Sequence, residues 1–234
     1  MSERSPTNIF SIIIIMGRKK NIRFREIEDN FNVIQQGKPL FDTIKGHWLS
    51  DFFKNNNPII LELGCGKGEY TVGLAKLFPD KNFIGIDIKG DRMAVGSNQA
   101  IDQSLNNVAF VRTKVHDIEN FFNENEVAEI WITFPDPHSL HSGIRRRITN
   151  ERFLKMYKKL LNIDGLLHLK TDNEPFFDYS IETLNKFKIR NFIHTKDLYK
   201  SDLNNIHHGI KTNFEEKFTT KGFNINYLSC QFTQ

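Results

Sequence analysis

Residues 58–70 read PIILELGCGKGEY, an apolar run that stops at three closely spaced glycines. The run 58–63 has the length and composition of a buried strand. Residues 69–78, EYTVGLAKLF, carry apolar side chains at helical spacing. Glycines between a strand and a helix let the backbone turn tightly and approach a ligand closely. The stretch therefore predicts a strand, a ligand-binding turn and a helix, which together open an α/β fold.

The alternation of strands and helices continues to the end of the chain. The expected strands are 58–63, 82–88, 107–112, 126–134, 165–171, 190–196 and 223–232, and the expected helices are 69–78, 91–105, 150–161 and 174–187. This order predicts a mostly parallel sheet covered by helices on both faces. No long helix is evident between the last two strands, so we expect the final strand to be antiparallel.

The length of 234 residues suits one domain with a short extension. We expect 1–15 to be a disordered extension, with Met16 as a candidate start. We expect 16–57 to be a basic N-terminal segment and 58–234 to be the main domain. The four isoleucines of 12–15 are too few to cross a bilayer, which takes about 20 apolar residues. The sequence therefore predicts no membrane segment.

Positive charge is concentrated in two places, although the net charge is only +4. The first is RKKNIRFR at 18–25, and the second is Arg145, Arg146 and Arg147. Basic clusters neutralise phosphates in nucleic acids, and a solvated surface is an equally good interpretation of either cluster alone. The two cysteines make neither a disulfide framework nor a zinc site, which fits a reducing cytoplasm.

Acidic residues lie near the ends of the first two predicted strands. Glu62 precedes the glycine turn, and Asp87 ends the second strand, where doubly wound folds place an acid that binds ribose hydroxyls. Carboxylates suit the hydroxyls and the ammonium group of S-adenosylmethionine and repel the pyrophosphate of NAD. The spacing G-x-G-x-G also differs from the dinucleotide pattern G-x-G-x-x-G. We therefore favour S-adenosylmethionine, with NAD as the alternative. The predicted cofactor-binding residues are Glu62, Gly64, Gly66, Gly68 and Asp87.

A second loop follows the fourth predicted strand and reads FPDPHSLHSGIRRRIT at 134–149. Asp136 stands between two prolines, and a residue before proline is restricted to extended conformations. We therefore expect Phe134 and Asp136 to be extended, with the carboxylate at the ligand-binding edge of the sheet. A purely structural turn is the alternative. The arginines behind the loop form the second basic cluster.

These motifs together resemble the bacterial tRNA (guanine-N7)-methyltransferases, from about Met16 to the C-terminus. The resemblance is carried by ELGCGKG, GIDI, FPDP with the arginines behind it, HLKTDN at 168–173 and TNFEEKF at 212–218. It implies a seven-stranded, Rossmann-like class I methyltransferase fold. It also implies methyl transfer from S-adenosylmethionine to N7 of the guanosine at position 46, in the tRNA variable loop.

The resemblance also implies roles for single residues. Glu62, Asp87 and Asp117 match cofactor-binding acids, and Asp136 matches the catalytic acid. Asp117 lies in VHD at 115–117, where either it or His116 would meet the adenine. The positions assigned to substrate binding are Asp172, Thr212, Asn213, Phe214 and Glu215, and the phosphate contacts are Arg145, Arg146 and Arg147. One departure is Leu140, which stands where the family has lysine.

The reaction that the resemblance implies needs no general base to create the nucleophile, because guanine N7 carries a lone pair and no proton. We expect Asp136 to position the base and to stabilise its developing positive charge rather than to remove a proton. The adjacent His207 and His208 lack carboxylate or cysteine partners, so no metal is expected. The expected partner is tRNA, and the protein is expected to be a monomer or homodimer. A tRNA-binding protein without turnover is the main alternative, and an NAD-dependent oxidoreductase is the other.

Overall fold

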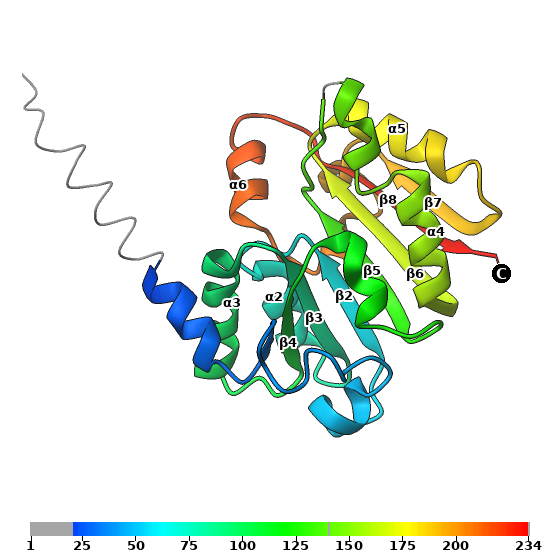
Figure 1. Cartoon of the computed structure of the whole chain (residues 1–234). Helices are drawn as coiled ribbons and strands as arrows, with labels where there is room; N and C mark the ends of the chain where they lie inside the picture. The colour runs from blue at the N-terminus through cyan, green and yellow to red at the C-terminus, as the bar shows by residue number, and fades with distance from the viewer. Residues whose placement is uncertain (1–20, 140, 234) are drawn as a thin grey trace, which may run out of the picture.

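The computed structural model describes residues 21–139 and 141–233 (Figure 1). The predicted extension 1–15, the candidate start Met16, the first three residues of the basic cluster 18–25 and Leu140 lie outside this range. Residues 27–53, which the sequence assigns to the basic N-terminal segment, contribute Ile27, Ile44 and Trp48 to the buried core.

Eight strands form one sheet across the described residues. They are β1 (Val33–Ile34), β2 (Ile59–Leu63), β3 (Asn82–Asp87), β4 (Val108–Arg112), β5 (Val127–Thr133), β6 (Leu161–Thr171), β7 (Ile189–Thr195) and β8 (Asn226–Phe232). Their order is β1-β4-β3-β2-β5-β6-β8-β7, and β8 runs antiparallel to both of its neighbours. The α/β fold with an antiparallel last strand is thus confirmed. The seven expected strands are β2 to β8, and the two-residue β1 is an addition at the edge.

Helices cover both faces of the sheet (Figure 1). α2 (Glu69–Leu77) and α3 (Gly90–Asp102) pack on one face, and α4 (Glu151–Leu160) and α5 (Glu174–Leu184) pack on the other. As predicted, Asn150 caps α4, where its side chain accepts a hydrogen bond from the Arg152 amide at 3.3 Å. Shorter helical turns are η1 (Trp48–Phe53), η2 (Val115–Asn120), η3 (His141–Arg146), η4 (Leu198–Lys200), η5 (Asn204–His207) and α6 (Asn213–Thr219).

Two apolar clusters fill the space between the sheet and its helices. The larger lies on the α4 and α5 side, and the smaller lies beneath α2 and α3. Alternate strand residues serve the two clusters, since Leu61 and Leu63 face the larger one and Ile60 the smaller. By the same alternation Glu62 faces the α2 side of the sheet.

The strand order reverses direction between β2 and β5. From β2 the chain builds outward through β3 and β4, and from β5 it builds the other way through β6. In open α/β sheets such a switch point forms a crevice at the carboxyl ends of the strands, where ligands bind. Both motifs that the sequence singled out, the glycine turn and the FPDP loop, leave the sheet at this point. No helix of the described chain has the length and apolar character needed to cross a bilayer.

Candidate functional site at the carboxyl edge of the sheet

Five acidic residues lie at or just beyond the carboxyl ends of five neighbouring parallel strands. Glu62 is in β2, Asp87 ends β3, Asp117 follows β4, Asp136 follows β5 and Asp172 follows β6. These strands are adjacent in the order β4-β3-β2-β5-β6, so the acids share one edge of the sheet. The sequence separates the first and last of them by more than a hundred positions, and the topology brings them together.

The glycine turn leaves β2 with all three predicted glycines in the left-handed region. An ideal Cβ built on Gly64 or Gly66 meets nothing within 4 Å, so the backbone there borders open space. A Cβ on Gly68 would instead lie 2.7 Å from the Phe110 ring. The first two glycines therefore leave room for a ligand to reach the backbone, and the third allows close packing of the turn on the sheet.

Asp87 fixes the shape of this turn. Its Oδ2 accepts a hydrogen bond from the Gly66 amide at 2.8 Å, and its Oδ1 accepts one from the Lys89 amide at 2.8 Å. Each carboxylate oxygen keeps a second lone pair, and the side chain is half-buried. Asp87 can therefore accept a hydrogen bond from a ligand hydroxyl while it holds together the two loops at the ends of β2 and β3.

Glu62 lies beneath the turn and is only 4% exposed. Its Oε2 accepts hydrogen bonds from the amide and hydroxyl of Thr71, and its Oε1 accepts one from the Thr133 hydroxyl at 2.6 Å. Burial raises the pKa of Glu62 to about 7, although these hydrogen bonds oppose the shift. Glu62 thus ties the glycine turn to α2 and to the end of β5, across the switch point.

The raised pKa of Glu62 predicts a pH-dependent contribution to stability. The folded protein holds this proton more tightly than the unfolded chain, whose carboxyl has the ordinary value of 4.5. The contribution is therefore complete below about pH 4.5 and is lost as the pH rises through about 7. We expect the free energy of unfolding of the wild type, minus that of Glu62→Gln, to fall across this window in urea titrations. If this difference in the free energy of unfolding did not change with pH, the raised pKa of Glu62 would be contradicted. Glu124→Gln, which changes an exposed glutamate, serves as the control.

The FPDP loop departs from the predicted conformation at its first residue. Phe134 has a φ of 49°, so the prediction that it is extended is wrong. Its amide still donates to the Lys170 carbonyl at 2.9 Å, which continues the β5–β6 pairing by one residue before the chain turns. A bulky residue at positive φ is a strained exception, and such residues concentrate at functional sites.

Asp136 projects from this loop into solvent, with 73% of its side chain exposed. Its Oδ1 accepts a hydrogen bond from the His138 amide at 3.0 Å, and the His138 ring Nδ1 lies 3.6 Å away. The carboxylate is therefore held by its own loop and is open to a ligand.

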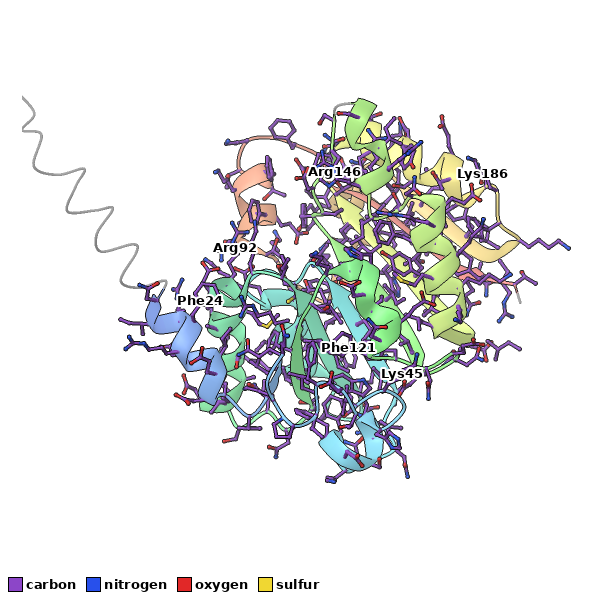
Figure 2. The ribbon with its side chains drawn as sticks, viewed as in Figure 1. Phe24, Lys45, Arg92, Phe121, Arg146 and Lys186 are labelled. Atoms are coloured by element: carbon purple, nitrogen blue, oxygen red, sulfur yellow. The ribbon has the colours of Figure 1, made fainter. Side chains whose placement is uncertain are left out.

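The three arginines of the second basic cluster separate into two kinds. Arg145 and Arg146 are exposed in η3, and Figure 2 shows Arg146 at the same end of the molecule as α6, with Lys45 at the opposite end. Arg147 instead donates from Nε to the Pro137 carbonyl at 3.0 Å and places its guanidinium 4.4 Å from the Tyr179 ring centroid. Arg147 thus anchors the FPDP loop to α5, and two arginines remain open to an anion.

The two remaining acids of the edge differ in their surroundings. Asp117 lies in η2 with 41% of its side chain exposed and its Oδ1 3.4 Å from the His116 ring. Asp172 is half-buried directly after β6, and this burial raises its pKa. Both are placed where they can reach a ligand at the edge.

The predicted substrate residues 212–215 begin α6. The Thr212 hydroxyl accepts a hydrogen bond from the Glu215 amide, and the Glu215 side chain accepts one from the Thr212 amide, which makes a complete capping box. Asn213 donates to the Glu69 carboxylate in the first turn of α2, and Phe214 is 53% exposed. The four residues therefore do different things: two cap the helix, one docks it beside the glycine turn, and one presents an aromatic ring.

Sequence reasoning missed Lys170, which is fully buried on β6 with its Nζ 2.7 Å from Glu215 Oε1. It also missed His168, whose ring stacks on Trp131 at 3.9 Å and whose Nδ1 lies 2.8 Å from the Tyr227 hydroxyl. The signal was present in LLHLK at 166–170, where two polar residues alternate with leucines in a strand covered on both faces. Buried lysine and histidine require specific partners, which the sequence cannot name.

No group of three or more histidine, cysteine, aspartate or glutamate side chains within the described ranges could hold a metal ion. His207 is buried, and its Nε2 pairs with Asn204 Oδ1 at 3.0 Å, whereas His208 packs edge-on against Phe78. His208 thus packs the end of η5 against the end of α2, whereas His207 packs edge-on against Tyr199 of η4.

Comparison with known proteins identifies relatives along nearly the whole chain. A family described as putative methyltransferase matches residues 56–228. The tRNA (guanine-N(7)-)-methyltransferase of Cytophaga hutchinsonii is 45% identical over 219 residues, which cover 93% of this chain and 99% of the relative. The enzyme of the same name from Christiangramia forsetii is 46% identical over 219 residues, covering 91% of this chain and 98% of the relative.

Solved structures resemble the fold at low sequence identity. A 16S rRNA methyltransferase, KamB, superposes with a TM-score of 0.59 at 13% identity, covering 80% of this chain and 93% of that one. A 30S ribosomal A1408 methyltransferase from an uncultured bacterium gives a TM-score of 0.58 at 14% identity, covering 86% of this chain and 98% of that one. At these identities the similarity establishes the class I methyltransferase fold.

Proposed function

We propose, because this chain belongs to the tRNA (guanine-N(7)-)-methyltransferase family, that it methylates N7 of the guanosine at position 46, in the variable loop of tRNA, with S-adenosylmethionine as the donor. The observation that carries the proposal is the shared edge at the switch point, where the glycine turn and Asp136 leave neighbouring strands. With tRNA as the substrate, we expect this activity in the cytoplasm.

The donor set of the glycine turn fits S-adenosylmethionine. Gly64 and Gly66 border open space, and Asp87 keeps free lone pairs for ribose hydroxyls. Asp117 lies at the neighbouring strand end, where it or His116 can meet the adenine amine. When bound there, S-adenosylmethionine supplies an electrophilic methyl group on a positively charged sulfonium. The acids of this edge suit a cationic ligand and disfavour a pyrophosphate, which supports this donor over NAD.

Asp136 is suited to an electrostatic and positioning role. The purine gains positive charge as its N7 lone pair forms the new bond, and a fixed carboxylate nearby stabilises that charge. The Asp136 carboxylate is held by the His138 amide, and its loop is anchored through Pro137 to Arg147. The loop therefore presents a pre-oriented negative charge and needs no proton transfer to act.

The RNA is expected to cross the exposed basic and aromatic residues near the carboxyl edge of the sheet. Arg145 and Arg146 offer phosphate contacts, and the exposed Phe214 ring offers a surface for stacking on a base. A transcript in which only guanosine 46 is replaced by adenosine tests the position. We expect that transcript to accept no methyl group, and methylation equal to that of the unchanged tRNA would overturn the proposed position.

Removing the two open arginines should weaken tRNA binding and flatten its salt dependence. Each phosphate contact contributes about 0.7 to 0.9 to the magnitude of the slope of log K against log salt concentration. The slope of the Arg145→Ala/Arg146→Ala variant should therefore be smaller in magnitude by about 1.4 to 1.8. Filter binding at several salt concentrations measures this slope. Lys186→Ala, which removes an exposed charge after α5, serves as the control. Unchanged affinity and slope in the double variant would place the phosphate contacts elsewhere.

A further inference from the structure

The strongest unassigned feature of the site is the ion pair between Lys170 and Glu215. Both side chains are 0% exposed, and Lys170 Nζ lies 2.7 Å from Glu215 Oε1. The pair joins the end of β6 to α6, two elements separated by more than forty residues of chain. Neither charge can reach solvent, so each depends on the other for its stabilisation.

The surroundings of Lys170 offer it little besides Glu215. Its Nζ lies 5.1 Å from the Tyr70 ring centroid and 5.9 Å from the Phe134 ring centroid. Burial lowers the pKa of Lys170, whereas Glu215 and, more weakly, Glu62 favour its charged form. Loss of Glu215 would therefore leave a cation among aromatic rings.

The carboxylate of Glu215 is used entirely inside the protein. Besides Lys170 it accepts a hydrogen bond from the Tyr199 hydroxyl at 2.6 Å and one from the Thr212 amide at 3.3 Å. With no exposed surface, it has no open face toward an RNA. Its contacts instead gather η4, the N-terminus of α6 and β6 around one buried point.

Residues 204–219, which we call the substrate arm, lie over α2 through two further contacts. Asn213 donates to Glu69 at the start of α2, and the Ile210 side chain occupies the space above Gly73, where an added Cβ would lie 3.0 Å from it. These contacts set the arm beside the glycine turn. The backbone carbonyl of Lys170 also accepts a hydrogen bond from the amide of Phe134, the first residue of the FPDP loop.

We propose that Lys170 and Glu215 form a latch that fastens the substrate arm to the catalytic edge of the sheet, so that Glu215 is a positioning residue and Phe214 makes the arm's contact with RNA. The inference rests on the proposed function for the identity of the substrate. Within the motif TNFE at 212–215, the buried Thr212 and Glu215 place the arm together with Asn213, which contacts α2, and the exposed Phe214 meets the base. Lys170 also connects the arm to the FPDP loop, so one residue aligns both parts of the RNA site.

The test compares Lys170→Met, Glu215→Gln and the double variant Lys170→Met/Glu215→Gln. Each single change leaves one buried charge unpaired, which is strongly unfavourable, whereas removal of both charges is tolerated far better. Glutamine retains an oxygen for the Tyr199 hydroxyl. Lys81→Met, which breaks the Lys81–Glu129 ion pair of 2.7 Å outside the RNA site, controls for the loss of any salt bridge.

Two readouts separate a latch from a direct RNA contact. The first is amide hydrogen exchange of 204–219 in the protein without RNA or cofactor, where we expect each single variant to lose protection and the double variant to regain it. The second is kcat/KM for tRNA. Displacement of the arm should lower kcat/KM of each single variant by about 100-fold, and the double variant should recover most of this loss. Phe214→Ala should raise KM for tRNA and leave arm protection unchanged.

Two outcomes would overturn the latch. One is full protection of the arm in both single variants. The other is a double variant that stays as slow as Glu215→Gln although its arm is protected, which would mean that Glu215 contacts the RNA itself. Because amide exchange is measured without substrate, it tests the latch whether or not the protein methylates tRNA. A wild-type protein that makes no 7-methylguanosine would overturn the proposed function and leave the test of the latch unaffected.

Discussion

Asp136→Ala is expected to lower kcat for methyl transfer by about 100- to 1,000-fold, the usual cost of removing one pre-oriented electrostatic group. The carboxylate is 73% exposed and held by the His138 amide, so its loss removes charge from the carboxyl edge of the sheet without opening the core. Cofactor affinity and thermal stability should therefore stay close to those of the wild type. Single-turnover transfer of labelled methyl groups to tRNA measures the rate directly.

Two further variants show which property of Asp136 matters. Asp136→Asn keeps the acceptor for the His138 amide and removes the charge, so a rate as low as that of alanine would assign the effect to charge. Asp164→Asn changes an acid that is 80% exposed and pairs with Arg190 away from the edge, and it should transfer methyl groups at the wild-type rate. A full rate for Asp136→Ala would remove this residue from the mechanism.

Asp87→Ala should be the most damaging change to cofactor binding. The substitution removes the acceptor of the Gly66 and Lys89 amides and the predicted acceptor of ribose hydroxyls. Hydrogen bonds to a charged group contribute about 1.5 to 3 kcal/mol each, so loss of one such contact weakens binding roughly 10- to 150-fold. Isothermal titration with S-adenosylmethionine gives the dissociation constant.

The control for this prediction lies at the other end of β3. Asp80 is exposed in the turn before β3, at the opposite edge of the sheet, and Asp80→Ala should bind the cofactor as the wild type does. Asp87→Asn keeps one side-chain acceptor and should fall between the two. Tight cofactor binding by Asp87→Ala would show that the ribose is held by other groups.

Local sequence patterns were sufficient for most of the fold. Each strand from β2 to β8 is apolar enough to be recognised, and Asn150 is a cap that can be read from its type and position. The added strand β1 could not be recognised, because Val33 and Ile34 alone are too short a run to show any period. Their pairing with β4 depends on the tertiary structure.

The candidate site was predictable where one residue acts through its own local geometry. Gly64 and Asp87 belong to that class, because a strand, a tight turn and a second strand end imply their positions. The conformation of Phe134 was not predictable, because its pairing with Lys170 and the turn of the loop overrode the preference of a residue before proline. The burial of Glu215 and the anchoring role of Arg147 depend on partners that only the folded chain brings within reach.

We propose that this edge of the sheet carries out methyl transfer to guanine N7. The most direct measurement incubates the protein with tRNA and S-adenosylmethionine labelled in the methyl group, followed by digestion of the RNA and separation of its nucleosides. We predict that the label is recovered as 7-methylguanosine and that Asp136→Ala yields at least about 100-fold less labelled 7-methylguanosine in the same time. Label in a different nucleoside, or tRNA that is bound tightly without any methylated product, would contradict it.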